Sequence, residues 1–128
     1  MKTSMKLVAA FACALAACAA HAQGAFPTRP VRIIVAYPPG GGIDVLGRQL
    51  AERLAPQWGQ PVVVENRPGG STIPAAELVA KAPADGHTIL LTSDSTFSIN
   101  THLFARLPYS DRDFVPVTQL ILLPELLL

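Results

Sequence analysis

Cysteine is scarce in this sequence of 128 residues, which contains two, Cys13 and Cys18, both near the N-terminus. The segment around them begins with two lysines, continues as an apolar stretch to Ala20 and ends in the triplet Ala-His-Ala at 20–22. That order is typical of a bacterial secretory signal, and the apolar stretch is too short to span a bilayer as a stable helix. We therefore expect residues 1–22 to be a signal peptide that takes no part in the fold.

Cleavage after Ala22 leaves a mature chain without cysteine, and so without a disulfide, a thiol nucleophile or a cysteine-ligated metal site. A second route stays open, because Leu15 to Cys18 also resemble a lipobox, in which Cys18 is lipidated and becomes the mature N-terminus. The plainer alternative is that Cys18 is only a small apolar residue of the signal. Each route leads to the periplasm, either as a free protein or as one anchored by lipid through Cys18.

The sequence also lacks an excess of either charge. Ten Lys and Arg oppose nine Asp and Glu, and loss of the two lysines of the signal leaves eight against nine. A surface that binds nucleic acid would need clustered Lys and Arg, so we expect no nucleic-acid partner. The roughly one hundred residues after the signal are enough for one domain but not for two full ones.

Strand and helix patterns alternate after the signal. Residues 31–37 are mostly apolar, rich in β-branched side chains and bounded by prolines, which predicts a buried strand of a parallel sheet. Residues 43–58 carry Leu and Trp at helical spacing and predict an amphipathic helix, in which Pro56 kinks or ends the last turn. Further elements are expected as a strand over 61–65, a helix over 75–81, a strand over 87–92, a short helix over 101–107 and a strand over 114–123.

The order of these elements predicts the fold class. Alternating strands and helices at this spacing imply right-handed crossovers and an α/β fold with an open parallel sheet and helices on its faces. The loop 66–72 contains Pro68 and two glycines as chain reversers, and we expect Ser71 or Thr72 to cap the following helix. We find no internal repeat after the signal.

Two loops at one edge of this sheet are candidates for binding, because ligands of open α/β sheets lie beyond the carboxyl ends of the strands. The first loop holds three glycines, which let a ligand approach the main chain, and the next helix start offers N–H groups to an anion. The second loop supplies hydroxyl groups. The alternatives are a tight turn in which Asp44 merely favours the helix dipole, and ordinary capping in the second loop. The candidate ligand-binding residues are Tyr37, Pro38, Pro39, Gly40, Gly41, Gly42, Ile43 and Asp44 in the first loop, and Thr92, Ser93, Asp94, Ser95 and Thr96 in the second.

Other chemistries fit less well. A phosphate-binding P-loop needs Lys and then Ser or Thr after its glycines, whereas this chain continues with Gly47, Arg48 and Gln49. Ser95, His102 and Asp94 can be imagined as a hydrolase triad, but no Gly-x-Ser-x-Gly elbow surrounds the serine. No pair of histidines has a recognisable metal spacing. We therefore expect no cofactor, no metal and no catalysis.

The stretches "FPTRPVRIIVAYPPGGGIDVLGRQLAERL", "GQPVVVENRPGG", "KAPADGHTILL" and "LPYSDRDFVPVT" together resemble the tripartite tricarboxylate transporter receptors, also called Bug or TctC-type proteins. The resemblance covers Phe26 to about Thr118. It implies a monomeric, periplasmic, two-domain receptor that closes on a small organic acid and delivers this carboxylate to membrane permease subunits. By position, Tyr37 and the turn 38–44 match the first ligand loop of the family, and 92–96 match the second.

The sequence departs from the family pattern in two places. Ser71 to Pro74 stand where members more often have glycines and alanines. The chain also stops at Leu128, so we expect 26–128 to be a partial binding domain: domain I and the start of the crossover to domain II of a truncated two-domain fold. An exported α/β hydrolase-like enzyme and an interaction protein without a small ligand remain the alternatives.

Overall fold

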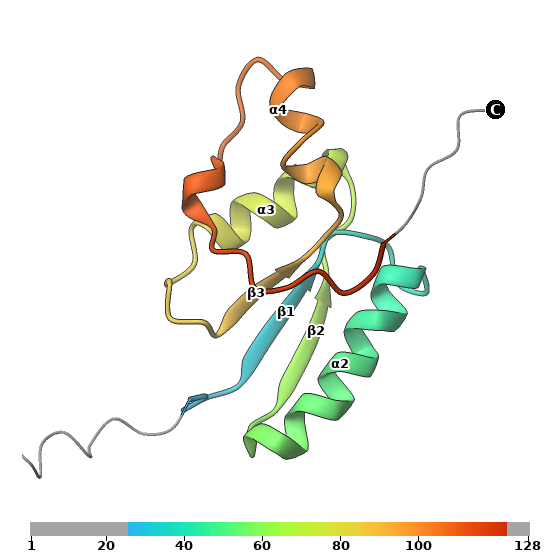
Figure 1. The fold of residues 1–128 in the computed structure, drawn as a ribbon, viewed down its shortest axis with the longest axis vertical. Helices are drawn as coiled ribbons and strands as arrows, with labels where there is room; N and C mark the ends of the chain where they lie inside the picture. Colours follow the sequence, from blue (N-terminus) through green and yellow to red (C-terminus); the bar gives the residue numbers. More distant parts are fainter. Residues whose placement is uncertain (1–25, 123–128) are drawn as a thin grey trace, which may run out of the picture.

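The computed structural model describes residues 26–122. The expected signal peptide with Cys18, and the last residue of the predicted 114–123 strand, lie outside the described residues. Figure 1 shows the elements in chain order. They are β1 (Val31–Val35), α2 (Gly42–Trp58), β2 (Val62–Asn66), the 3₁₀ turn η1 (Gly70–Thr72), α3 (Ile73–Ala80), β3 (Thr88–Leu91), the 3₁₀ turn η2 (Asp94–Thr96), α4 (Asn100–Leu103) and the 3₁₀ turn η3 (Asp111–Asp113).

The three strands form one parallel sheet in the order β2-β1-β3. The apolar side chains of β1 make it the central strand, and Val31, Ile34 and Val35 are completely buried. Helix α2 packs against β1 and β2, whereas α3 packs against β1 and β3, so the two helices cover opposite faces (Figure 1). The predicted α/β fold with a parallel sheet and flanking helices is confirmed.

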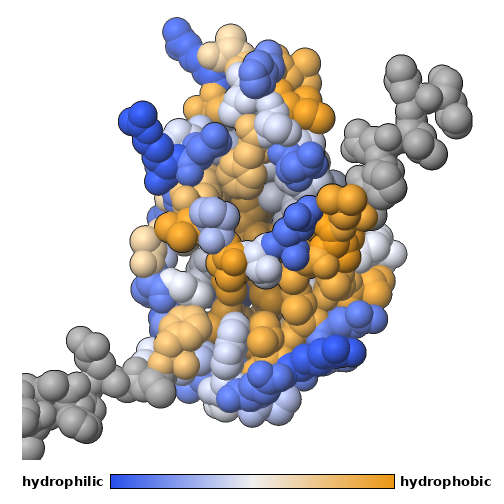
Figure 2. Space-filling model, viewed as in Figure 1, coloured by the Kyte–Doolittle hydropathy of each residue, from blue (hydrophilic) through white to orange (hydrophobic). Residues whose placement is uncertain are grey.

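Helix α2 begins and ends within one residue of its prediction. Pro56 lies in its last turn, and Gly59 ends it with a left-handed backbone at φ 63°. The residues of α2 that are fully buried are small or polar: Asp44, Gly47 and Ala51. The apolar side chains expected to face the core are only partly buried, namely Leu46, Leu50, Leu54 and Trp58. Figure 2 shows hydrophobic side chains gathered at the surface around the sheet and α2.

The prediction of a strand over 114–123 is wrong for its described residues, since 114–122 have no regular structure. Val115 and Val117 are 88% and 83% exposed. An apolar run becomes a strand only where a neighbouring strand accepts its N–H and C=O groups, and among residues 26–122 the sheet contains only β1, β2 and β3.

Two local predictions also need correction. The helix expected over 101–107 is the single turn α4, because the chain turns back at Phe104 and brings the Tyr109 hydroxyl to the Thr96 carbonyl oxygen at 2.7 Å. Thr72 does precede α3, but its side chain does not cap the helix. The Thr72 hydroxyl lies 2.8 Å from that of Thr96 instead. Within 26–122, no helix is both long and apolar enough to cross a membrane.

Candidate ligand-binding site

The loops that follow β1 and β3 meet at the carboxyl edge of the sheet, because these strands are parallel neighbours. The Tyr37 hydroxyl, just after β1, lies 2.7 Å from the Ser93 hydroxyl, just after β3. Ser93 in turn lies 2.7 Å from the Ser95 hydroxyl. The structure therefore brings three of the predicted residues, Tyr37, Ser93 and Ser95, into one row of hydroxyl groups.

The glycine turn, defined here as Gly40 to Gly42, follows Tyr37 in the loop between β1 and α2. Gly40 has φ +85°, a left-handed backbone that favours glycine, and a Cβ built at Gly40 or Gly42 would meet no atom within 4 Å. At Gly41 the nearest atom to such a Cβ is the Pro38 carbonyl oxygen at 3.5 Å. The turn is thus open on its outer side, and Pro38 and Pro39 before it are exposed.

Helix α2 starts at Gly42, so the N–H groups of Gly42, Ile43 and Asp44 belong to its first turn. N–H groups in a first turn have no acceptor within the helix, and they carry the positive end of the helix dipole. An anion placed at such a helix start accepts these hydrogen bonds without any arginine or lysine. The turn therefore has the chemistry of a carboxylate-binding loop.

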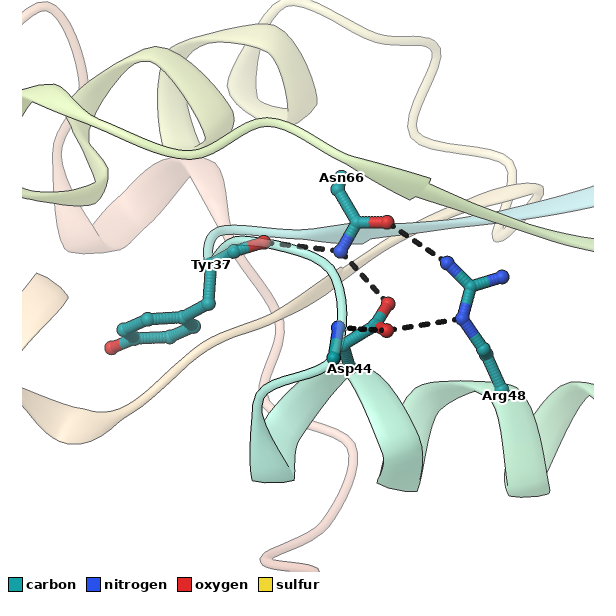
Figure 3. A network of polar contacts seen from close by, with 5 residues as sticks. Tyr37, Asp44, Arg48 and Asn66 are labelled. Carbon is teal, nitrogen blue, oxygen red and sulfur yellow. Dashed lines mark hydrogen bonds and ion pairs between the residues drawn. The ribbon is translucent and has the colours of Figure 1, made fainter.

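Asp44 is almost fully buried, at 2% exposure, and its carboxylate is engaged within the protein (Figure 3). Its Oδ2 accepts hydrogen bonds from Arg48 Nε at 3.0 Å and Gly40 N at 2.8 Å, and its Oδ1 accepts one from Asn66 Nδ2 at 2.8 Å. These donors, Arg48 foremost, lower the pKa of Asp44 from 3.8 to about 2. That Asp44 contacts a ligand stays a prediction.

Asn66, the last residue of β2, was missed at the sequence level. Its Nδ2 donates to the Tyr37 carbonyl oxygen at 3.0 Å as well as to Asp44, and its Oδ1 accepts from Arg48 Nη2 at 3.1 Å (Figure 3). Two signals were available. Asn66 ends a strand at the same sheet edge, and Asp44 and Arg48 have the i, i+4 spacing of a helical ion pair.

The threonines of the second loop face the interior. Thr96 is fully buried, and its hydroxyl lies 2.6 Å from that of Thr92 and 2.8 Å from that of Thr72. Asp94 is exposed, next to the half-buried Ser93 and Ser95. Of the hydroxyl groups predicted in the second loop, those of Ser93 and Ser95 are therefore the ones that lie in the row with Tyr37.

Ser95 and His102, considered above as part of a hydrolase triad, make separate contacts in the structure. His102 Nδ1 lies 2.8 Å from the Ser98 carbonyl oxygen and 3.1 Å from the Thr101 hydroxyl, whereas the Ser95 hydroxyl pairs with Ser93. Within 26–122, no three His, Cys, Asp or Glu residues are grouped so that they could hold a metal ion. Two shallow hollows of about 400 and 380 Å³ lie along residues 98–112, away from the glycine turn.

Comparison with known proteins decides the family. Residues 46–128 match the sequence model described as "Tripartite tricarboxylate transporter family receptor". The chain belongs to this family. The match begins just after the glycine turn and includes β2, β3 and the second loop. The resemblance noted at the sequence level is therefore confirmed.

Individual proteins and solved structures are also similar to this chain. The chain is 42% identical over 125 residues to the "UPF0065 protein in tcbD-tcbE intergenic region" of Pseudomonas sp. strain P51, covering 95% of this chain and 37% of that protein. It matches MatC from Rhodopseudomonas palustris with bound malate at a TM-score of 0.67 and 38% identity, over 72% of this chain and 32% of MatC. A structure described as a periplasmic transporter matches at a TM-score of 0.63 and 36% identity, over 67% of this chain and 29% of its own. The chain thus spans about a third of the length of these relatives.

Proposed function

We propose that this chain provides part of the ligand-binding site of a periplasmic receptor for a small carboxylate. The observation that carries the proposal is the contact of 2.7 Å between the Tyr37 and Ser93 hydroxyls, which joins the loop after β1, where the glycine turn lies, to the loop after β3. A carboxylate needs several hydrogen-bond donors in a fixed arrangement. Hydroxyls and first-turn N–H groups at one edge supply them. MatC, a relative with bound malate, supports this ligand class.

The proposal extends to export and delivery. Residues 1–22 would direct the protein to the periplasm, with a lipid anchor at Cys18 as the second route. There the receptor would pass its ligand to the membrane permease subunits of a tripartite tricarboxylate-type transporter. The mass of the mature protein, isolated from the periplasm, distinguishes cleavage after Ala22 from lipidation at Cys18. A mature protein that still carries residues 1–22 would contradict export by this signal.

Titration of the chain with organic acids, followed by amide chemical shifts in NMR, tests the ligand class even where affinity is only millimolar. We expect malate and related dicarboxylates to shift the amides of Gly42, Ile43 and Ser93, while the neutral diamide of malate does not. The charged and neutral molecules have the same shape, so the comparison isolates the anionic oxygens. Absence of shifts with every carboxylate would overturn the proposed function.

The Gly41→Val variant tests whether the glycine turn takes part. At Gly41 the backbone has φ −74° and ψ 163°, which valine adopts readily, and a new Cβ has room. We expect the fold to persist and the affinity for malate to fall about tenfold or more, because the side chain keeps the ligand from the main chain. Gln49→Val, which places the same side chain on an exposed face of α2, is the matched control. Unchanged affinity in a folded Gly41→Val protein would leave the turn with a structural role only.

A further inference from the structure

We propose that Asp44, Arg48 and Asn66 are positioning residues that hold the glycine turn of the proposed carboxylate site in its binding geometry, and that none of them contacts the ligand. This inference rests on the proposed function and deepens it. We call these three side chains the turn-holding network (Figure 3).

The network holds the segment 37–40 at both of its ends. Asn66 Nδ2 donates to the main-chain oxygen of Tyr37 at 3.0 Å, and Asp44 Oδ2 accepts from the main-chain N–H of Gly40 at 2.8 Å. Asn66 also donates to Asp44 Oδ1 at 2.8 Å, so one pair of side chains links the end of β2 to the start of α2. On its other side, the same segment is tied to the β3 loop through the Tyr37 hydroxyl.

The network also selects which N–H groups stay open. The Gly40 N–H is used by Asp44, whereas the N–H groups of Gly42 and Ile43 belong to the first helical turn and point out of it. Both carboxylate oxygens of the buried Asp44 are already engaged, so Asp44 has little capacity left for a ligand donor. A buried, satisfied network of this kind fixes one geometry of the chain around it.

The charge of Asp44 allows two possible roles to be distinguished by the direction in which ligand affinity changes. Asp44 places a negative charge in the first turn of α2, close to where an anionic ligand would lie, and Arg48 balances that charge at 3.0 Å. If Asp44 acted only through its charge, its removal would strengthen anion binding. If Asp44 holds the turn, its removal weakens binding even though a repulsive charge is lost.

The experiment compares Asp44→Asn with Glu52→Gln, which removes one negative charge from an exposed position of the same helix. We expect Asp44→Asn to bind malate about tenfold more weakly and the control to stay within about twofold of the wild type. In the ligand-free protein, hydrogen exchange of the Gly40 amide should become about tenfold faster in Asp44→Asn and remain unchanged in the control. Stronger malate binding by Asp44→Asn, or unchanged Gly40 exchange, would overturn the inference.

A second pair of variants covers the case that Asp44→Asn does not fold. The Arg48 side chain is half exposed, so Arg48→Gln keeps the core intact, and the exposed Arg53→Gln is its matched control. We expect the Gly40 amide to exchange faster in Arg48→Gln than in the wild type. In Arg53→Gln it should exchange at the wild-type rate. Failure of the wild type to bind any carboxylate overturns the proposed function, whereas the Gly40 measurement needs no ligand and tests the network by itself.

Discussion

Four consecutive residues, Gly69 to Thr72, have a positive φ, and two of them are not glycine. Ser71 and Thr72 have φ values of 53° and 69°, a region that costs an L-residue about 1–2 kcal/mol. Tertiary contacts offset this cost. Asn100 Nδ2 donates to the Ser71 carbonyl oxygen at 2.7 Å, and the Thr72 hydroxyl lies 2.8 Å from that of Thr96. Ser71 and Thr72 are among the positions where this chain departs from the glycines and alanines expected for its family.

The two residues should respond differently to glycine. Ser71 is exposed, so Ser71→Gly relieves backbone strain and should raise the free energy of unfolding by about 0.5–1 kcal/mol after the entropy cost of glycine. Thr72 is buried, and Thr72→Gly loses a hydroxyl contact worth about 1 kcal/mol. This substitution should therefore not raise the free energy of unfolding. Denaturant unfolding of both variants measures the difference. Destabilisation by Ser71→Gly would show that the left-handed backbone at this residue is not strained.

At the scale of elements, α2 approaches the sheet closely because its buried face is made of small residues. A Cβ at Gly47 would lie 3.0 Å from Leu91 Cδ2 and 3.2 Å from Val35 Cγ2, tighter than ordinary contact. Glycine at this position therefore sets the distance between α2 and the sheet. That distance also decides whether Asp44, one turn earlier on the same face, reaches Asn66.

A large side chain at Gly47 should push α2 away from the sheet. We expect Gly47→Leu to lower the free energy of unfolding by about 1–3 kcal/mol through overpacking, despite the better helix propensity of leucine. Gln49→Leu, on the exposed face of α2, should be neutral or slightly stabilising and serves as the control. Thermal and denaturant unfolding measure both. Equal stability of the two variants would mean that α2 can move out at no cost.

At the scale of the whole molecule, an aspartate secures each end of the sheet. Asp44 lies at the carboxyl edge, and Asp85 lies just before β3 at the opposite edge, where it accepts from the His87 N–H at 3.0 Å and from Arg29 Nη2 at 2.7 Å. These donors, the His87 N–H foremost, lower the pKa of Asp85 from 3.8 to about 2. Phe26, between Trp58 and His87, closes the same end with ring centroids 5.8 and 5.0 Å away.

These two carboxylates make stability depend on pH in acid. A pKa lowered by folding means that the folded state binds protons less readily than the unfolded state, so the stabilisation is complete above pH 3.8 and is lost as pH falls toward about 2. We expect the free energy of unfolding to decline over that range, and to decline less steeply in Asp44→Asn or Asp85→Asn. Urea unfolding at several pH values measures the slopes. Equal slopes in the wild type and both variants would show that Asp44 and Asp85 do not cause the loss of stability in acid.

Much of the site could be anticipated from the sequence, because its outline depends on local pattern. The apolar run of β1, the helical spacing of α2 and the glycines between them are properties of neighbouring residues. The rule that parallel strands end at one edge then places Tyr37 near Ser93. The same reasoning left out Asn66, whose contacts with Tyr37 and Asp44 join residues that are distant in the sequence.

What the sequence alone determined is the set of strands and α-helices up to β3, the α/β class and the family resemblance, all of which rest on short-range patterns. Only the tertiary structure decided that Asn66 bridges Tyr37 and Asp44, that the Thr72 side chain pairs with Thr96 instead of capping α3, and that 114–122 do not join either edge of the sheet. The physical reason is common to all three. A hydrogen bond between distant residues depends on where the fold places each partner, and the spacing along the chain does not record this.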